Sequence, residues 1–239
     1  MADFISIVHN YSENEPFWVL NKKASIPSAP LKEGDFSALG ELIKLFPEAK
    51  KVSGGKKIEY GLVHRIDTET SGLLLVAGRQ DFYDEILLAQ KNGLFLKSYS
   101  AECEKCTSIL SDFDGFPPLP EDFALGRENI VSSKFRYFGK HNFCVRPVSS
   151  KSGPASQKKA SDKIYTTKIF LEKTDKGYFA HSRIAQGFRH QVRCHLAWCG
   201  FPVKGDVLYN PNAKQNDEMK FCASGLYFSW NEKNFSFEL

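Results

Sequence analysis

Residues 62–77 read LVHRIDTETSGLLLVA, and this stretch organises the interpretation of the whole chain. Its second half, residues 73–77, is an apolar run that predicts a buried strand. Its first half places His64, Arg65, Asp67 and a second acid within six residues. The small residues 70–72 between the halves suit a tight turn. A reactive loop braced by a strand and a plain surface loop with solvated charges both fit these residue types.

The composition is that of an ordinary globular protein. Its 239 residues include 42% hydrophobic and 25% charged residues, which is typical of soluble domains. This length is enough to bury a substantial core and suits one large domain or two small ones. We interpret residues 1–239 as a single domain.

The charge is unevenly distributed along the chain. The formal net charge is only +4, but residues 132–168 contain nine basic residues and a single acid. That segment therefore carries +8, and the remainder of the chain carries −4. A localised basic face can attract a polyanion, although a lysine-rich solvated loop would have the same composition. Most of this charge lies in residues 107–163, which are rich in Pro, Gly, Ser and Asp and predict surface loops around a strand pair.

The cysteines do not predict a metal site. Cys103 and Cys106 form one C-x-x-C motif, but no second such motif completes a zinc ligand set. Cys194, His195 and Cys199 could supply further ligands, yet their helical spacing favours ordinary core packing. We expect no signal peptide from the first residues of the sequence, and no apolar run approaches the ~20 residues that cross a bilayer. We therefore expect a cytoplasmic protein with free thiols, no metal and no membrane partner.

Hydrophobic periodicity and turn residues predict the elements. We expect strands at 5–8, 17–21, 94–103, 133–137, 142–148, 164–173 and 177–184, and two short strands within 226–239. We expect helices that follow Asp35 and end at Pro47, that begin at an Asp81 cap and end at Gly93, and that span 187–200 with Arg189 and Arg193 on one face. Strands grouped in hairpins argue for an α+β fold with a largely antiparallel sheet. No dinucleotide or phosphate-binding glycine motif is present, so we expect no nucleotide cofactor.

Three separated segments supply groups that could act together. Asp67 could be a nucleophile or general base, and an arginine such as Arg193 could keep it ionised and oriented. Tyr99 could exchange a proton or stack on a planar substrate. The residues alone do not prove that they converge, since Tyr99 could be a core residue and Arg193 part of a structural ion pair.

A family resemblance links these segments. Residues 64–75, HRIDTETSGLLL, resemble the aspartate motif of the RluA family of RNA pseudouridine synthases. Three further segments agree in the same order. Residues 17–24 resemble the early strand ending in Asn-Lys-Pro, residues 97–101 resemble a Lys-x-Tyr-x-Ala strand, and residues 187–197 with 205–209 resemble a late helix and loop.

The resemblance implies a pseudouridine synthase fold with a central RNA-binding cleft, and an isomerase that converts uridine in rRNA or tRNA to pseudouridine without a cofactor. Asp67 would be the nucleophile, acting at the sugar, at the base or through a glycal intermediate. Tyr99 would lie against the uracil, and Arg193 would pair with Asp67. The target nucleotide would leave its stack, with Arg65 filling the space or holding the backbone. The residues expected to bind RNA are His64, Arg65, Lys97, Lys158, Lys159, Arg189, His190 and Gln191.

The sequence also departs from the family pattern. Lys23 replaces a usual proline, Ser25 a usual glycine, and Phe188-Arg189 a usual Arg-Thr; Cys222-Ala223 stands where Leu-His-Ala is typical. Residues 107–163 diverge as well, so we expect them to set the choice of RNA. We expect a monomer with no small RNA-binding domain before the catalytic domain. The alternatives are an inactive RNA-binding protein on the same fold and a hydrolase with an Asp nucleophile on another fold.

Overall fold

A computed structural model describes residues 4–106 and 114–239. These fall into two compact units, the first formed by Met1–Lys97 with Cys222–Leu239 and the second by Ser98–Phe221. The chain leaves the first unit within β4 (Leu96–Cys103) and returns to it at the start of β9 (Phe221–Trp230). The single domain expected from the sequence stays a prediction.

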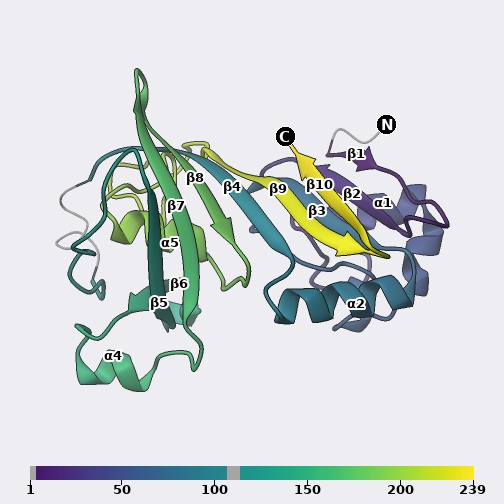
Figure 1. Ribbon diagram of the computed structural model, residues 1–239, viewed down its shortest axis with the longest axis horizontal. Coiled ribbons are helices and arrows are strands. Elements are labelled where there is room, and N and C mark those ends of the chain that lie inside the picture. The colour runs from purple at the N-terminus through teal and green to yellow at the C-terminus, as the bar shows by residue number, and fades with distance from the viewer. Residues whose placement is uncertain (1–3, 107–113) are drawn as a thin grey trace. The chain divides into compact units, whose positions relative to one another are not determined.

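The first unit is built on a sheet of hairpins. β1 (Ile5–His9) pairs antiparallel with β2 (Phe17–Lys22), and β2 pairs antiparallel with β3 (Ser71–Ala77). β9 and β10 (Lys233–Glu238) form a second antiparallel pair (Figure 1). β3 and β9 join these two sets in parallel, with Ser71 opposite Cys222. The predicted α+β class with a largely antiparallel sheet is confirmed.

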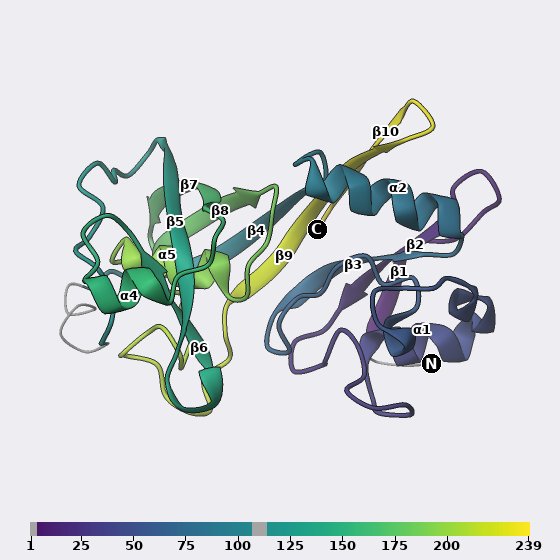
Figure 2. The ribbon, with the colours of Figure 1, turned by 90° about the horizontal axis from the view of Figure 1, so that it is seen from below.

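Alternation along β2 places a helix on each face of this sheet. Phe17 stacks on Phe82 of α2 (Gln80–Lys91), with ring centres 4.8 Å apart. The ring of the next residue, Trp18, has its centre 5.6 Å from the ring centre of Phe46. Phe46 directly follows α1 (Ala38–Leu45). Successive side chains of a strand point to opposite faces, and Figure 2 shows the sheet between the two helices. Two short 3₁₀ turns, Pro47–Lys51 and Lys57–Glu59, follow α1.

Of the two helices in this unit, α2 has a capping residue that differs from the prediction. Ser37 caps α1 by accepting a hydrogen bond from the Gly40 amide. The predicted Asp81 cap of α2 is wrong, because the capping position is Arg79 and the helix starts at Gln80. Asp81 lies in the first turn, where its carboxylate oxygen is 2.6 Å from Nε of Arg79. A negative charge at this end of a helix is stabilised by the helix dipole.

The second unit is a sheet in the order β4-β8-β7-β5-β6. The antiparallel pairs β5 (Glu128–Phe138) with β6 (Cys144–Val148), and β7 (Tyr165–Thr174) with β8 (Gly177–Ile184), confirm both predicted hairpins. A 3₁₀ turn at Lys140–Asn142 connects β5 to β6. The short helix α4 (Pro154–Lys158) occupies part of the segment expected to be loop alone. Residues 107–113 of that segment lie outside the described residues.

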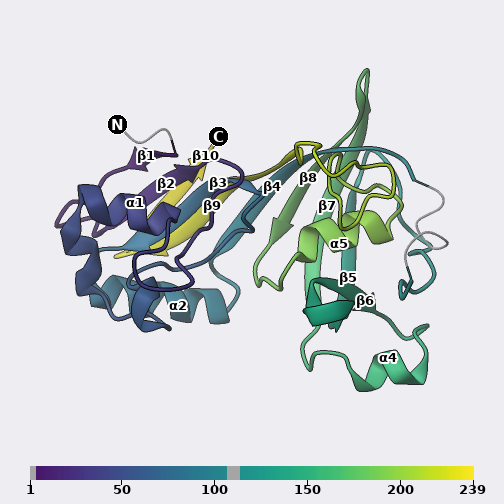
Figure 3. The same ribbon diagram turned by 180° about the vertical axis from the view of Figure 1, so that it is seen from behind.

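Helix α5 (Gln191–Trp198) lies on one face of the second sheet (Figure 3). It starts later than the predicted 187–200, because His190 adopts a left-handed conformation with φ 54°. Arg189 therefore precedes the helix, and the expectation that it shares a helical face with Arg193 is wrong. Every residue of α5 is buried.

The residues considered as metal ligands have structural roles. The ring nitrogens of His195 lie 2.9 Å from the Ser133 hydroxyl and 2.8 Å from that of Thr167. Burial lowers the pKa of His195 to about 3, and the Cys194 thiol donates to the Val145 carbonyl. Within residues 4–106 and 114–239, no cluster of His, Cys, Asp or Glu side chains could hold a metal ion. No helix in the same ranges is long and apolar enough to span a membrane, and all six cysteines are free thiols.

Candidate active site

The Asp67 loop closes with a turn three residues earlier than the sequence indicated. The Thr70 amide donates to the Asp67 carbonyl at 3.1 Å, and Ser71 already belongs to β3. Asp67 is half-buried, whereas Ile66 before it is buried. The loop therefore presents the carboxylate while its neighbour is anchored in the core.

Gly72 is required by the approach of two strands. It has φ +118°, and a Cβ atom built on it would lie 2.3 Å from the Ala223 carbonyl oxygen. Any side chain would separate β3 from β9 at the point where they pair. This contact is the physical reason for a glycine directly after the loop.

Residues 22–28 hold the Asp67 loop through side-chain hydrogen bonds. The Ser28 hydroxyl donates to the Ile66 carbonyl at 2.7 Å and accepts from the Ile66 amide at 3.1 Å. Ser25, which replaces the family's usual glycine, has φ 64°, a left-handed conformation that glycine adopts at little cost. Its hydroxyl donates to Glu69 at 3.0 Å. The departure at Ser25 therefore adds a contact to the loop.

Lys22 is the strongest support that sequence reasoning missed. Its side chain is fully buried, and its ammonium donates to the carbonyls of Lys23 at 2.9 Å and Thr68 at 3.0 Å. Burial lowers the pKa of Lys22 to about 8, while the charges of Glu69 and Asp67 oppose that shift. The lysine of the early-strand motif was the available signal, because a charge is placed in a core only with partners.

Two residues predicted to bind RNA are buried in the first unit. His64 is 7% exposed, and its Nε2 accepts a hydrogen bond from the Leu75 amide at 3.3 Å. Burial, aided by the charge of Lys97, lowers the pKa of His64 well below its ordinary value. Lys97 is 5% exposed, with its ammonium 5.4 Å from the centre of the Phe95 ring. Neither side chain offers a surface group, so neither enters the RNA interface proposed below.

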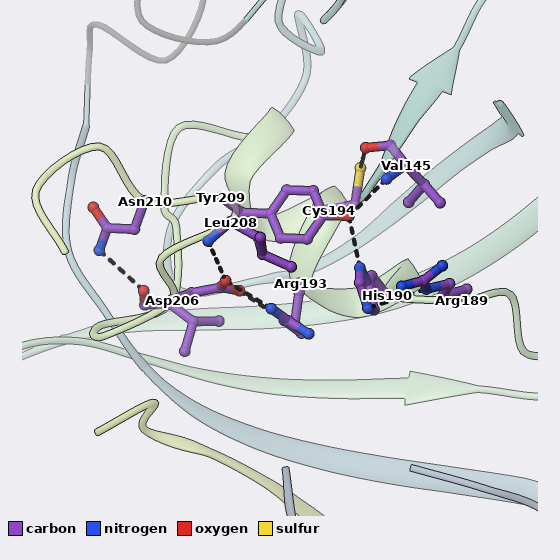
Figure 4. A network of polar contacts seen from close by, with 10 residues as sticks. Val145, Arg189, His190, Arg193, Cys194, Asp206, Leu208, Tyr209 and Asn210 are labelled. Carbon is purple, nitrogen blue, oxygen red and sulfur yellow. Dashed lines mark hydrogen bonds and ion pairs between the residues drawn. The ribbon is translucent and has the colours of Figure 1, made fainter. Parts of the chain in front are cut away.

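In the second unit, Arg193 is held by a carboxylate that the sequence reasoning did not single out. Its Nε and Nη2 each lie 2.7 Å from an oxygen of Asp206, and both residues are buried (Figure 4). The Leu208 amide also donates to Asp206. The resemblance over residues 205–209 contained this aspartate but gave it no role.

Tyr209 links Arg193 to the start of α5. Its ring centre lies 5.4 Å from the guanidinium carbon of Arg193. Its hydroxyl accepts from the Val145 amide at 2.9 Å and lies 3.0 Å from Nδ1 of His190. The Arg193 guanidinium is therefore held along its edge by Asp206 and against its carbon by the Tyr209 ring.

Tyr99 is partly buried in the second unit. Its ring stacks on Phe221, with centres 5.3 Å apart and planes 7° apart. Asp67 belongs to the first unit, whereas Tyr99 and Arg193 belong to the second. The convergence of these three residues therefore stays a prediction.

The other residues predicted to bind RNA differ in exposure. Arg65 is exposed and pairs with Glu59 at 3.3 Å, and Lys158 and Lys159 are exposed at the end of α4. Gln191 is only 2% exposed and donates to the Thr166 carbonyl and the Thr167 hydroxyl. It therefore has a structural role in anchoring α5 to the sheet.

A family model described as RNA pseudouridylate synthase matches residues 16–198. The chain belongs to the RNA pseudouridylate synthase family. The matched range covers both units and contains Asp67, Tyr99 and Arg193, so the predicted resemblance to RluA-type enzymes is confirmed.

Curated relatives share about a quarter of their residues with this chain. A Bacillus subtilis protein named uncharacterized RNA pseudouridine synthase YjbO is 25% identical over 90% of this chain and 65% of its own length. Ribosomal large subunit pseudouridine synthase D of Blochmanniella floridana is 24% identical over 87% and 57%. The tRNA pseudouridine(31) synthase of Saccharomyces cerevisiae is 26% identical over 87% and 48%. The chain thus spans about half to two thirds of the length of these relatives.

Two solved human structures share the fold. RNA Pseudouridylate Synthase Domain Containing 1 superposes with a TM-score of 0.67 at 18% identity, covering 98% of this chain and 82% of that one. RNA Pseudouridylate Synthase Domain Containing 4 gives 0.63 at 17% identity, with 98% and 87% covered. At these identities the likeness concerns the fold alone.

Proposed function

We propose that the protein is an RNA pseudouridine synthase that isomerises uridine in ribosomal or transfer RNA. The observation that carries this proposal is family membership combined with an intact aspartate loop, in which Lys22 and Ser28 hold the residues around Asp67. Ribosomal RNA and tRNA are both named for relatives of this chain.

In the proposed reaction the C1′–N1 bond of the target uridine breaks, the base turns, and a C1′–C5 bond forms. The hydrogen on C5 leaves to solvent while N1 takes up a proton, so substrate and product are isomers and no redox partner is consumed. Asp67 supplies the nucleophile, Tyr99 lies against the uracil and assists proton transfer, and Arg193 orients the carboxylate. The target nucleotide has to leave its stack to react.

RNA would reach this chemistry along exposed basic residues. Arg65 carries the exposed positive charge nearest to Asp67 in sequence, and Arg189, Lys158 and Lys159 carry exposed positive charge in the second unit. We extend the proposal to a monomer in the cytoplasm, in keeping with six free thiols.

The test is release of tritium from rRNA and tRNA labelled at uracil C5. Wild-type protein is expected to release it, and Asp67→Asn, which keeps the size of the side chain but removes the nucleophile, is expected not to. A control at Asp84, an exposed carboxylate of α2, should leave release unchanged when replaced by Asn. RNA binding without any release by the wild-type protein would instead support an inactive RNA-binding protein on this fold.

A further inference from the structure

The connection between β5 and β6 exposes two aromatic rings. Tyr137 is 50% exposed and Phe143 is 46% exposed. Between them the backbone is left-handed at Gly139 (φ +80°), His141 (φ 56°) and Asn142 (φ 58°). A Cβ atom on Gly139 would lie 1.9 Å from the Phe143 ring, so this ring covers the glycine backbone. We call Tyr137 and Phe143 the aromatic rim.

The rim is held by the dipeptide that precedes α5. The Phe188 ring stacks on Phe135 with centres 5.0 Å apart and planes 6° apart, and it meets the Tyr137 ring at 5.7 Å. The Arg189 guanidinium donates to the carbonyls of Asn142 at 3.0 Å and Phe143 at 3.2 Å. Phe188 thus holds the Tyr137 ring, and Arg189 holds the backbone that carries Phe143, both relative to the start of the helix. This reduces the ordering cost of a ligand that uses the two rings.

The same contacts continue to Arg193. His190 follows Arg189 and meets the Tyr209 hydroxyl, and the Tyr209 ring faces the Arg193 guanidinium (Figure 4). Every step of this path lies within the second unit. The aromatic rim is therefore connected through packed side chains to a residue of the candidate active site.

The surroundings of the rim are cationic. No Asp or Glu occurs between residues 132 and 161, a range that contains Arg136 and Lys140. Arg146 of the same range is buried and offers no surface charge. Arg136 lies over the Phe138 ring at 4.7 Å, on the face of β5 opposite to Tyr137. The exposed charges beside the rim are therefore Lys140, within the connection itself, and Arg189. Exposed flat rings among positive charges suit a nucleic acid strand, since the charges attract phosphates and every base has a face that can stack.

We propose that the aromatic rim stacks an unpaired base of the RNA beside the target uridine, with Lys140 and Arg189 facing its phosphates. This inference deepens the proposed function by naming single-stranded RNA as the element read next to the reacting nucleotide. It rests on that function for its role in modification, but the stacking contact itself can be measured as binding.

The experiment measures binding of a fluorescein-labelled oligouridylate of about 12 nucleotides by anisotropy, at two salt concentrations. Tyr137→Ala and Phe143→Ala are each expected to weaken binding about 5- to 150-fold, the range for loss of one stacked base. The salt slope should not change, because no charge is removed. Tyr137→Phe should bind as tightly as wild type, since it keeps the ring.

The matched control is Phe170→Ala. Phe170 is 37% exposed on β7, and its neighbour Ile169 is buried, so the Phe170 ring lies on the sheet face opposite the core. This variant should bind oligouridylate normally. An RNA duplex of the same length offers no unpaired base, so the rim variants should bind it as the wild type does.

A second readout distinguishes the loss of base stacking from misfolding of a variant. An oligouridylate with one 2-aminopurine should lose fluorescence on binding wild type and Tyr137→Phe, and keep it with Phe143→Ala. Equal binding by wild type and both rim alanine variants, with unchanged melting temperatures, would overturn the proposal and point to a protein partner for this surface. Tritium release is measured separately, so wild-type stacking without release would sink the proposed function and leave the rim as an RNA-binding surface.

Discussion

Arg193 and Asp206 form a buried bidentate ion pair, with both nitrogen–oxygen distances at 2.7 Å. The pair joins the first turn of α5 to the loop that follows the helix. Because the carboxylate occupies Nε and Nη2 together, the guanidinium plane is fixed. Orientation of Arg193 is thus a property of the second unit itself.

Removing the charge of Asp206 should destabilise the folded protein, because the Arg193 cation is buried. Asp206→Asn is expected to lower the free energy of unfolding by about 3 kcal/mol or more, because the Arg193 charge stays buried without its counter-ion. Urea unfolding measures this. Glu218→Gln, which breaks an exposed pair with Lys220, should change it by less than about 1 kcal/mol. Equal effects of the two variants would show that the buried pair contributes nothing special.

In the same variant, turnover should fall more than RNA affinity. Asp206 does not reach the substrate in this proposal and acts only by orienting Arg193. Tritium release and oligouridylate binding measured on one preparation separate the two effects. Loss of affinity with normal turnover of bound RNA would contradict the assigned role.

The free energy of unfolding should depend on pH through Lys22, which contacts the Asp67 loop. Its pKa is about 8 in the folded protein and ordinary in the unfolded chain, so the unfolded state holds the extra proton between about pH 8 and 10.5. Lys22 should therefore make the unfolding free energy rise with pH in this window, by about 2 kcal/mol from pH 8 to 9.5. Burial also lowers the pKa of Lys97 to about 8, so Lys22→Met should remove only the Lys22 share of the rise measured by urea unfolding, whereas Lys44→Met, at an exposed lysine of α1, should preserve the whole rise.

Lys22→Met should also slow turnover, since the Thr68 carbonyl loses its donor. A reduction of tenfold or more is expected if the loop needs this contact, because a hydrogen bond to a charged group is worth about 1.5–3 kcal/mol. Single-turnover tritium release provides the measurement. Unchanged release from a stably folded variant would assign the loop geometry to Ser28 instead.

Acid should destabilise the protein through His195. Its pKa is about 3 when folded, against about 6.5 when unfolded, so the unfolded state binds a proton that the folded state excludes. Stability from this residue is present above pH 6.5 and is lost as the pH falls. His195→Gln, compared with wild type by urea unfolding, should lose about 2 kcal/mol of the pH dependence between 6.5 and 5. Identical pH profiles would show that the buried ring can be protonated in place.

Charge on α4 should contribute to RNA affinity. Reversal of Lys158 and Lys159 to Glu is expected to weaken oligouridylate binding and to reduce its salt slope, because fewer counterions are released. Lys50 and Lys51, an exposed pair in the first unit, provide the matched reversal and should have the smaller effect. If both reversals weakened binding alike, net charge alone would account for the result.

Local pattern was sufficient where neighbours in sequence decide the outcome. Hairpins such as β7–β8 and the helix end at Gly93 follow from alternation and turn residues, which act over a few positions. The start of α5 could not be derived in this way, since the left-handed backbone at His190 accompanies contacts to Tyr209 and the adjacent connection. Helical periodicity continues through residue 189 without any signal of that break.

By itself the sequence determined the α+β class, the family and the identity of Asp67, Tyr99 and Arg193 as candidate residues, because motifs keep chemistry and spacing together. Only the tertiary structure decided what surrounds them. Lys22 and Asp206 emerged as supports, and His64 and Lys97 as buried residues, because burial and counter-charges depend on segments far apart in the chain. A charged residue reads alike in a sequence whether it meets water, RNA or a buried partner, and the fold alone selects among them.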